Sequence, residues 1–167
     1  MGRIYTLAAE NMSLGTGNVL AGFQTVASAS AGAFVAIHRI EISQSGSTTS
    51  AMIRAAASTR DTAGTLTTSS TAPLLLSPAG GPASAFAGNT NILGGTGRSG
   101  TNSSADSGGT YTNLFFWNFN NLNGMIWVPT PPELMIIPPS VVWVIRLLAS
   151  PATTTGWTVD VVLEELV

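Results

Sequence analysis

The chain has 167 residues, with six Arg, no Lys, eight acidic residues, one His and no Cys, and only 8% of its residues are charged. A typical soluble domain has about 25% charged residues, so neutral side chains supply most of the polarity here. Six scattered Arg cannot make the positive field that nucleic acids and anionic membrane surfaces require. A chain without Cys has neither disulfides nor thiolate metal sites.

Apolar residues make up 44% of the chain, which argues against disorder of the whole molecule. The longest apolar runs, around Val141–Ile145 and Met135–Ile137, fall far short of the roughly 20 residues of a membrane-spanning helix. The N-terminal residues also lack the apolar core of a signal peptide. We therefore expect a protein that is made in a cytoplasm and does not enter a membrane.

The N-terminal part of the chain shows the sequence patterns of β-strands. Arg3–Ala9 is a short strand candidate, and Phe34–Ser43 ends in a clear alternation of apolar and polar residues, which indicates a half-buried strand. Ser50–Ser58 is alanine-rich, and we interpret it as a strand that pairs with Phe34–Ser43 through a turn at Gln44–Thr49. These three segments predict β-structure near the N-terminus.

Residues 59–110 consist mostly of Gly, Ser, Thr, Ala, Asn and Pro. Structureless stretches of this length are uncommon inside compact domains, so we predict a long exposed excursion over residues 77–110 that orders against a partner. Pro73–Pro78 and Ala83–Ala87 are the two segments of this stretch that could pack against the sandwich or add an edge strand. Gly95–Gly100 fits the GxGxxG pattern, but the polar residues after it cannot form the helix that a dinucleotide site needs.

Strand patterns return after residue 110. Asn123-Gly124 is a strong signal for a two-residue hairpin that joins the strands on either side of it. Proline pairs and a Gly-containing turn separate the later strands. The predicted strands of this half are Tyr111–Asn120, Met125–Val128, Glu133–Ile137, Val141–Ala149 and Trp157–Val167.

Eight or nine short strands with frequent turn signals and no helical period predict an all-β fold. We expect residues 1–167 to form a single β-sandwich domain, specifically a jelly roll, with the long excursion in its middle. On the Tyr111–Asn120 strand, Phe115, Trp117 and Phe119 share one face and Phe116 takes the other. One face is then core, and the other is free to meet a second subunit or, as an alternative, a sugar.

Catalytic signals are weak. His38 is the single His, and it would need Glu41 or Asp160 and a Ser nearby to form a triad, so a structural role for it is favoured. Glu164 and Glu165 are adjacent and point to opposite faces of a strand. We predict no enzymatic activity, no cofactor and no metal site.

Several segments in order resemble a family of small jelly-roll virion proteins of tailed double-stranded DNA bacteriophages. They are the opening Ile4–Leu7 strand, Ile37–Ser45 with Ala51–Arg54 as its partner, the Gly/Ser/Thr/Asn-rich middle, and the closing series from Trp127–Glu133 through Ile136–Pro139 and Pro151-Ala152 to Val162–Leu166. The resemblance implies a capsid decoration, or cement, protein on the outside of the virion, made in the host bacterial cytoplasm.

The resemblance also implies two partners, the major capsid protein and two further copies of the chain in a homotrimer. We expect the N-terminal segment and the 77–110 excursion to lie on the capsid shell and exposed strand residues to meet other subunits. The candidate contact residues are Arg3, Ile4, Tyr5, Phe86, Ile92, Leu93, Arg98 and Phe116. The alternatives are a minor neck or tail-tip protein of the virion and a glycan-binding sandwich module.

Overall fold

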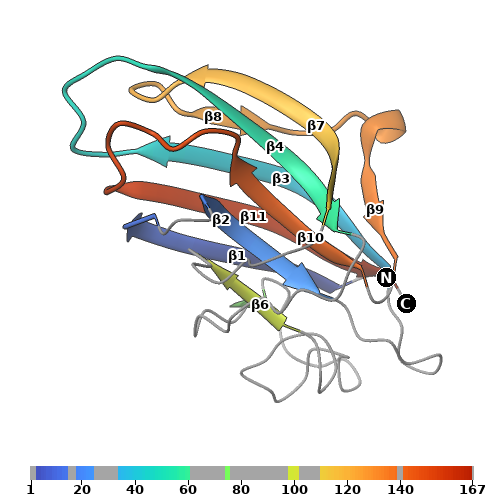
Figure 1. Cartoon of the computed structure of the whole chain (residues 1–167). Helices are drawn as coiled ribbons and strands as arrows, with labels where there is room; N and C mark the ends of the chain where they lie inside the picture. Colours follow the sequence, from blue (N-terminus) through green and yellow to red (C-terminus); the bar gives the residue numbers. More distant parts are fainter. Residues whose placement is uncertain are drawn as a thin grey trace.

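The chain is an all-β protein built from two antiparallel sheets that pack face to face (Figure 1), as the computed structural model shows. The predicted β-sandwich is therefore confirmed. The structure describes residues 3–14, 18–24, 34–60, 74–75, 98–101, 110–138 and 141–166. Within them lie eleven strands and one short 3-10 turn, η1 (Pro131–Glu133).

One sheet, here called sheet A, has the order β5-β1-β11-β3-β8, and β9 pairs with another stretch of β3. Its central strands are long, and β11 shows a strict alternation of buried and half-buried residues. The strands are β1 (Arg3–Met12), β3 (Phe34–Gln44), β5 (Leu74–Leu75), β8 (Met125–Trp127), β9 (Met135–Ile137) and β11 (Trp157–Leu166). The candidate edge strand at Pro73–Pro78 thus holds β5, which pairs with β1. Ala83–Ala87 lies outside the described residues.

The other sheet, here called sheet B, has the order β6-β2-β10-β4-β7. Its strands are β2 (Val19–Gln24), β4 (Met52–Arg60), β6 (Arg98–Thr101), β7 (Tyr111–Asn120) and β10 (Val142–Leu147). β6 lies inside the predicted 77–110 excursion and pairs with β2, so this part of the excursion belongs to the sheet. It also makes Arg98–Gly100 of the GxGxxG pattern a strand.

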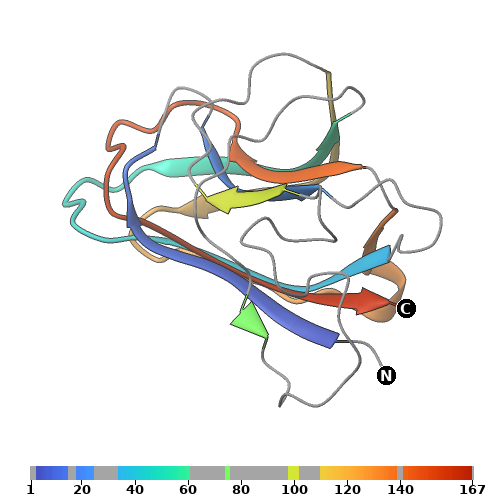
Figure 2. The same ribbon diagram turned by 90° about the horizontal axis from the view of Figure 1, so that it is seen from below.

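Two predicted strand pairings are wrong. β3 and β4 are joined by the expected turn, but β3 pairs in sheet A and β4 pairs in sheet B. The Asn123-Gly124 turn likewise joins β7 of sheet B to β8 of sheet A, so it forms no hairpin. Figure 2 shows the two layers that these connections link. A turn signal predicts where the chain reverses direction. Which strand each flanking strand pairs with depends instead on the side chains that become buried between the two sheets.

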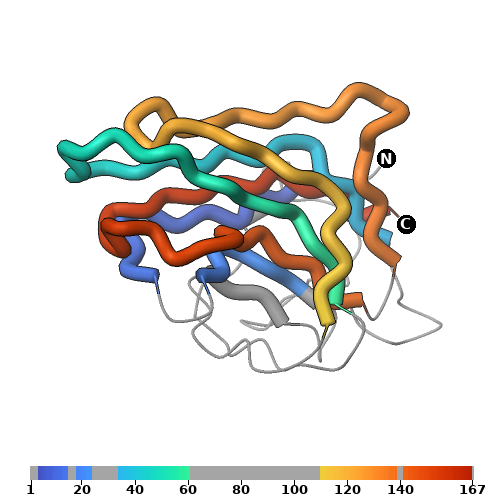
Figure 3. Tube along the Cα trace, turned by 45° about the horizontal axis from the view of Figure 1, so that its top comes forward, coloured from blue at the N-terminus to red at the C-terminus, as the bar shows by residue number. Residues whose placement is uncertain are grey.

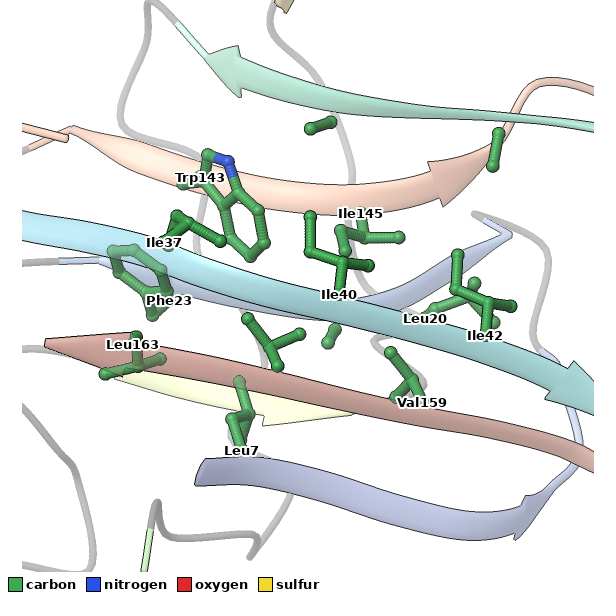
Figure 4. Close-up of a cluster of buried hydrophobic side chains, with 14 of the residues drawn as sticks. Leu7, Leu20, Phe23, Ile37, Ile40, Ile42, Trp143, Ile145, Val159 and Leu163 are labelled. Carbon is green, nitrogen blue, oxygen red and sulfur yellow. The ribbon is translucent and has the colours of Figure 1, made fainter. Parts of the chain in front are cut away.

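The core fills the space between the sheets (Figure 4). Trp143 of β10 is fully buried and stacks on Phe23 of β2, with 5.1 Å between the ring centroids. From sheet A, Leu7, Ile37 and Ile40 point at them and are also fully buried. Close packing of this kind favours a single rigid arrangement of the two sheets.

Three loops lie together at one end of the sandwich (Figure 3). Buried polar groups link them to one another. The Asn121 side chain is 3% exposed, donates to Gln44 Oε1 at 2.9 Å and accepts from the backbone N–H of Ala51 at 2.7 Å. Gln44 in turn donates to the carbonyl oxygen of Thr153. The β3–β4, β7–β8 and β10–β11 connections are therefore one linked unit, because breaking one bond leaves buried polar groups of another loop unsatisfied.

Candidate interaction surfaces

Charged side chains on the outer face of sheet A form pairs with one another. His38 Nε2 lies 2.8 Å from Glu164 Oε2, and both side chains are partly exposed. Arg39 forms an ion pair with Asp160, which also accepts a hydrogen bond from the Thr6 hydroxyl. His38 therefore meets neither of the two acids considered from the sequence, because Asp160 lies opposite Glu41, three residues further along β3, and a register shift leaves His38 itself unpaired between Arg39 and Ile37.

The hydrogen bond with Glu164 gives His38 a structural role. Among the described residues, no Ser hydroxyl forms a hydrogen bond with the His38 ring. Glu165, the neighbour of Glu164, faces the opposite way and is 1% exposed, as the strand pattern predicts. Among the described residues, no three His, Cys, Asp or Glu side chains gather as a metal site would require. The acids of β11 therefore do not form a paired acid–base site.

Apolar side chains surround these charge pairs on the same outer face. The register places Ile4 of β1, Glu164 of β11, Ala36 of β3 and Ile136 of β9 in one row across sheet A. Ile4 is 39% exposed and Ile136 is 51% exposed, and Phe34, two residues before Ala36, is 47% exposed. We call Ile4, Phe34 and Ile136 the sheet A patch.

The predicted contact residues divide between the surface and the core. Ile4 lies in the sheet A patch, whereas Tyr5 is 4% exposed and belongs to the core, so its side chain is not on a surface where a partner could contact it. Adjacent residues of a strand point to opposite sides, and only one of the two can face outward. Phe116 is 57% exposed on the outer face of sheet B.

The other predicted contact residues cannot be placed in this way. Arg3 and Arg98 lie in β1 and β6, where only their backbone positions are described. Phe86, Ile92 and Leu93 lie outside the described residues.

Three half-buried aromatic rings close the side of the sandwich between β7 and β8. Phe115 and Trp117 of β7 pack against Trp127 of β8, with centroid distances of 5.1 Å and 5.6 Å. The rings of each pair are tilted at 52° and 63°, and all three pack against the core. This arrangement is typical of aromatic packing, in which ring edges meet ring faces. It does not present the three rings as a flat row for a sugar.

A polar network occupies the outer face of sheet B near the start of β7. The guanidinium of Arg146 lies 4.1 Å from the centre of the Tyr111 ring and donates to Asn113 Oδ1 at 3.1 Å. Ser58 donates to the same oxygen at 2.7 Å. Arg60, 5.7 Å from the Tyr111 ring, is 5% exposed. Together with Arg39, which pairs with Asp160, three of the six Arg are thus engaged within the domain, and sequence patterns alone did not reveal this network.

Neither a protein-family model nor any curated protein or solved structure matches the chain. Within the part of the chain that the structure describes, no helix has the length and apolar character needed to span a membrane.

Proposed function

We propose that the protein is a structural component of a bacteriophage virion that binds the outer surface of the head and bridges major capsid subunits. The observation that carries the proposal is the sheet A patch, an exposed apolar surface on a rigid sandwich with almost no free charge. Most exposed apolar patches of this kind on soluble proteins mark sites of association. The homotrimer implied by the family resemblance remains a prediction.

The strand order supports the jelly-roll part of the proposal. β1, β11, β3 and β8 are neighbours in sheet A, and β2, β10, β4 and β7 are neighbours in sheet B. The first strand therefore lies beside the last, and the chain changes sheets from β1 to β2, from β3 to β4 and from β7 to β8. Eight strands wound in this way form the two Greek keys of a jelly roll.

The charge pairs beside the patch make docking less costly. Glu164 is paired with His38, and Asp160 is paired with Arg39, so a partner that covers these two carboxylates does not bury either of them as an isolated charge. The side chains of the patch are 39–51% exposed, so completing the burial of each one gains about 1 kcal/mol. Several copies bound to a repeating capsid lattice add avidity to these modest contacts.

The proposal is tested first by the copy number of the protein in purified virus particles. Quantitative mass spectrometry against the major capsid protein measures it directly. We expect a copy number comparable with that of the capsid protein. A handful of copies would assign the protein to the neck or tail tip, and its absence from particles would refute both structural roles.

Attachment is tested with particles that lack the protein and with purified variants added back. The double variant Ile4→Lys/Ile136→Lys places two charges in the sheet A patch and should weaken attachment by about 3 kcal/mol, or about a hundred-fold in Kd. Met52→Lys is the matched control, because Met52 is 69% exposed on sheet B. Equal attachment of the double variant and the control would show that the capsid binds elsewhere.

A further inference from the structure

The outer edges of the two sheets differ greatly in length. β5 has two residues, β8 and β9 have three each, and β6 has four. β7, the remaining edge strand, has ten residues and pairs with β4 along one side only, among the residues that the structure describes. Short edge strands are one way in which proteins prevent sheets from joining edge to edge. β7 lacks this protection.

The sequence of β7 also lacks two other usual protections of an edge strand, charged residues and proline. Its sequence, Tyr-Thr-Asn-Leu-Phe-Phe-Trp-Asn-Phe-Asn, contains no charged residue and no proline. Charged side chains and proline normally keep an exposed edge from pairing with another strand, by repulsion or by removing a hydrogen-bond donor. The one irregularity is a bulge near Leu114, and the register from Phe115 to Asn120 is regular.

The side chains of β7 add apolar surface to this open edge. Leu114 is 40% exposed and Phe116 is 57% exposed, and both lie on the outer face of sheet B. On the inner face, Phe115 and Trp117 are only half-buried, against Trp127. Among the described residues, the backbone groups on the outer edge of β7 have no partner strand. A strand that paired with this edge would also contact apolar side chains on both faces of the sheet.

We propose that β7 pairs with β7 of a second copy of this chain, antiparallel and across a two-fold axis, so that the two B sheets join into one. In the register that we propose, Phe116 lies opposite Phe116 of the second copy. Phe115 then lies opposite Trp117 of the second copy, so aromatic residues face aromatic residues on both sides of the joined sheet. Cross-strand aromatic pairs of this kind are among the favourable contacts between antiparallel strands.

A second copy fits this edge better than an unrelated strand because β7 is complementary to itself. Two-fold symmetry brings the same ten residues together, and none of them carries a charge that could repel its own copy. This inference does not rest on the proposed function, because it concerns the isolated protein and needs no virus particle. It predicts an even number of chains where the family resemblance predicts three, so the mass in solution decides between the two expectations.

The mass of the purified protein in solution provides the first test. Light scattering after size-exclusion chromatography should give an even number of chains, about 34 kDa for two chains of 17.1 kDa. Phe116→Lys should halve the mass, because it places two like charges opposite each other. Ile126→Lys, at a residue 67% exposed on β8, should leave the mass unchanged. A single chain or three chains for the unmodified protein, or the same mass for Phe116→Lys, would overturn the proposal.

A cross-link provides a second test that does not depend on weakening the contact. The chain has no Cys, so Phe116→Cys introduces a single thiol. Directly opposed residues of antiparallel strands have Cα atoms about 4.5–5.5 Å apart, which suits a disulfide. We expect Phe116→Cys to form a covalent dimer on oxidation and Ile126→Cys to stay monomeric on a non-reducing gel. Failure of Phe116→Cys to cross-link would refute the pairing.

Discussion

Gly156 lies where two loops at the linked end of the sandwich touch. Its φ of +77° is in the left-handed region, and a Cβ added there would lie 2.0 Å from the carbonyl oxygen of Ser45. The Gly156 carbonyl accepts a hydrogen bond from the Ser45 backbone N–H at 2.8 Å. A side chain at this position must therefore push the β3–β4 and β10–β11 loops apart and break that bond.

The cost of Gly156→Ala has two parts. The left-handed conformation costs a residue with a Cβ about 1 kcal/mol or more. Loss of the Ser45 hydrogen bond and displacement of its carbonyl add about 2 kcal/mol, because the groups involved are partly buried. We expect a total of about 3 kcal/mol in the free energy of unfolding, which in a domain of this size lowers Tm by about 10 °C.

Gly46 supplies a matched control. Its φ is +78°, but a Cβ built on it meets nothing within 4 Å. Gly46→Ala should therefore cost only the conformational part, about 1 kcal/mol, or about 3 °C in Tm. Thermal unfolding followed by tryptophan fluorescence compares the two variants. Equal losses of Tm would show that close contact between the loops does not contribute, and the reasoning would be refuted.

Two further substitutions test the buried polar network and the core. Asn121→Ala should lower the free energy of unfolding by about 3 kcal/mol, because it leaves the Ala51 N–H and Gln44 Oε1 without their partner, and urea unfolding measures this directly. A loss below about 1 kcal/mol would contradict that account. Ile40→Ala, at a fully buried side chain, should cost about 2–5 kcal/mol, whereas Ile126→Ala on the surface should change stability by less than about 0.5 kcal/mol. Similar urea midpoints for these two variants would refute the assigned core.

Alternation in the sequence located most of the strands. The Trp157–Val167 pattern predicted β11 and its buried face, and the aromatic run predicted β7 with the same bounds. Val19–Gln24 was missed as a strand because its residues do not alternate. Val19, Leu20, Ala21 and Phe23 are all buried, since this strand of sheet B is covered on both faces.

Pairing between strands could not be read from local signals. The Asn123-Gly124 dipeptide is typical of a hairpin turn, and Gly124 does have a positive φ of +66°. The strands that it joins nevertheless belong to different sheets, because β8 pairs with β3. Sheet membership depends on residues more than 80 positions away, such as Ile42 opposite Met125, and no local rule includes them.

Part of the candidate interaction surface could be predicted from the sequence. Alternation along β7 separates Phe116 from Phe115 and Trp117, and the structure places Phe116 on the outside. The same rule separates Ile4 from Tyr5 but does not say which of them faces the core. The sheet A patch was beyond prediction, because Ile4 and Ile136 fall in one row across the sheet, with Glu164 and Ala36 between them, only through the register of β1, β11, β3 and β9.

The winding of the chain between the sheets has a consequence for its synthesis. β1 and β3 both pair with β11, and Thr6 of β1 hydrogen-bonds to Asp160, 154 positions further along the chain. A ribosome must therefore complete β11 before sheet A can close, so until then β1 and β3 lack the long strand that lies between them. Domains dominated by such distant contacts fold slowly, in milliseconds to seconds, and are exposed to aggregation meanwhile. With only 8% charged residues, the unfolded chain has little charge repulsion to keep it from associating during this interval.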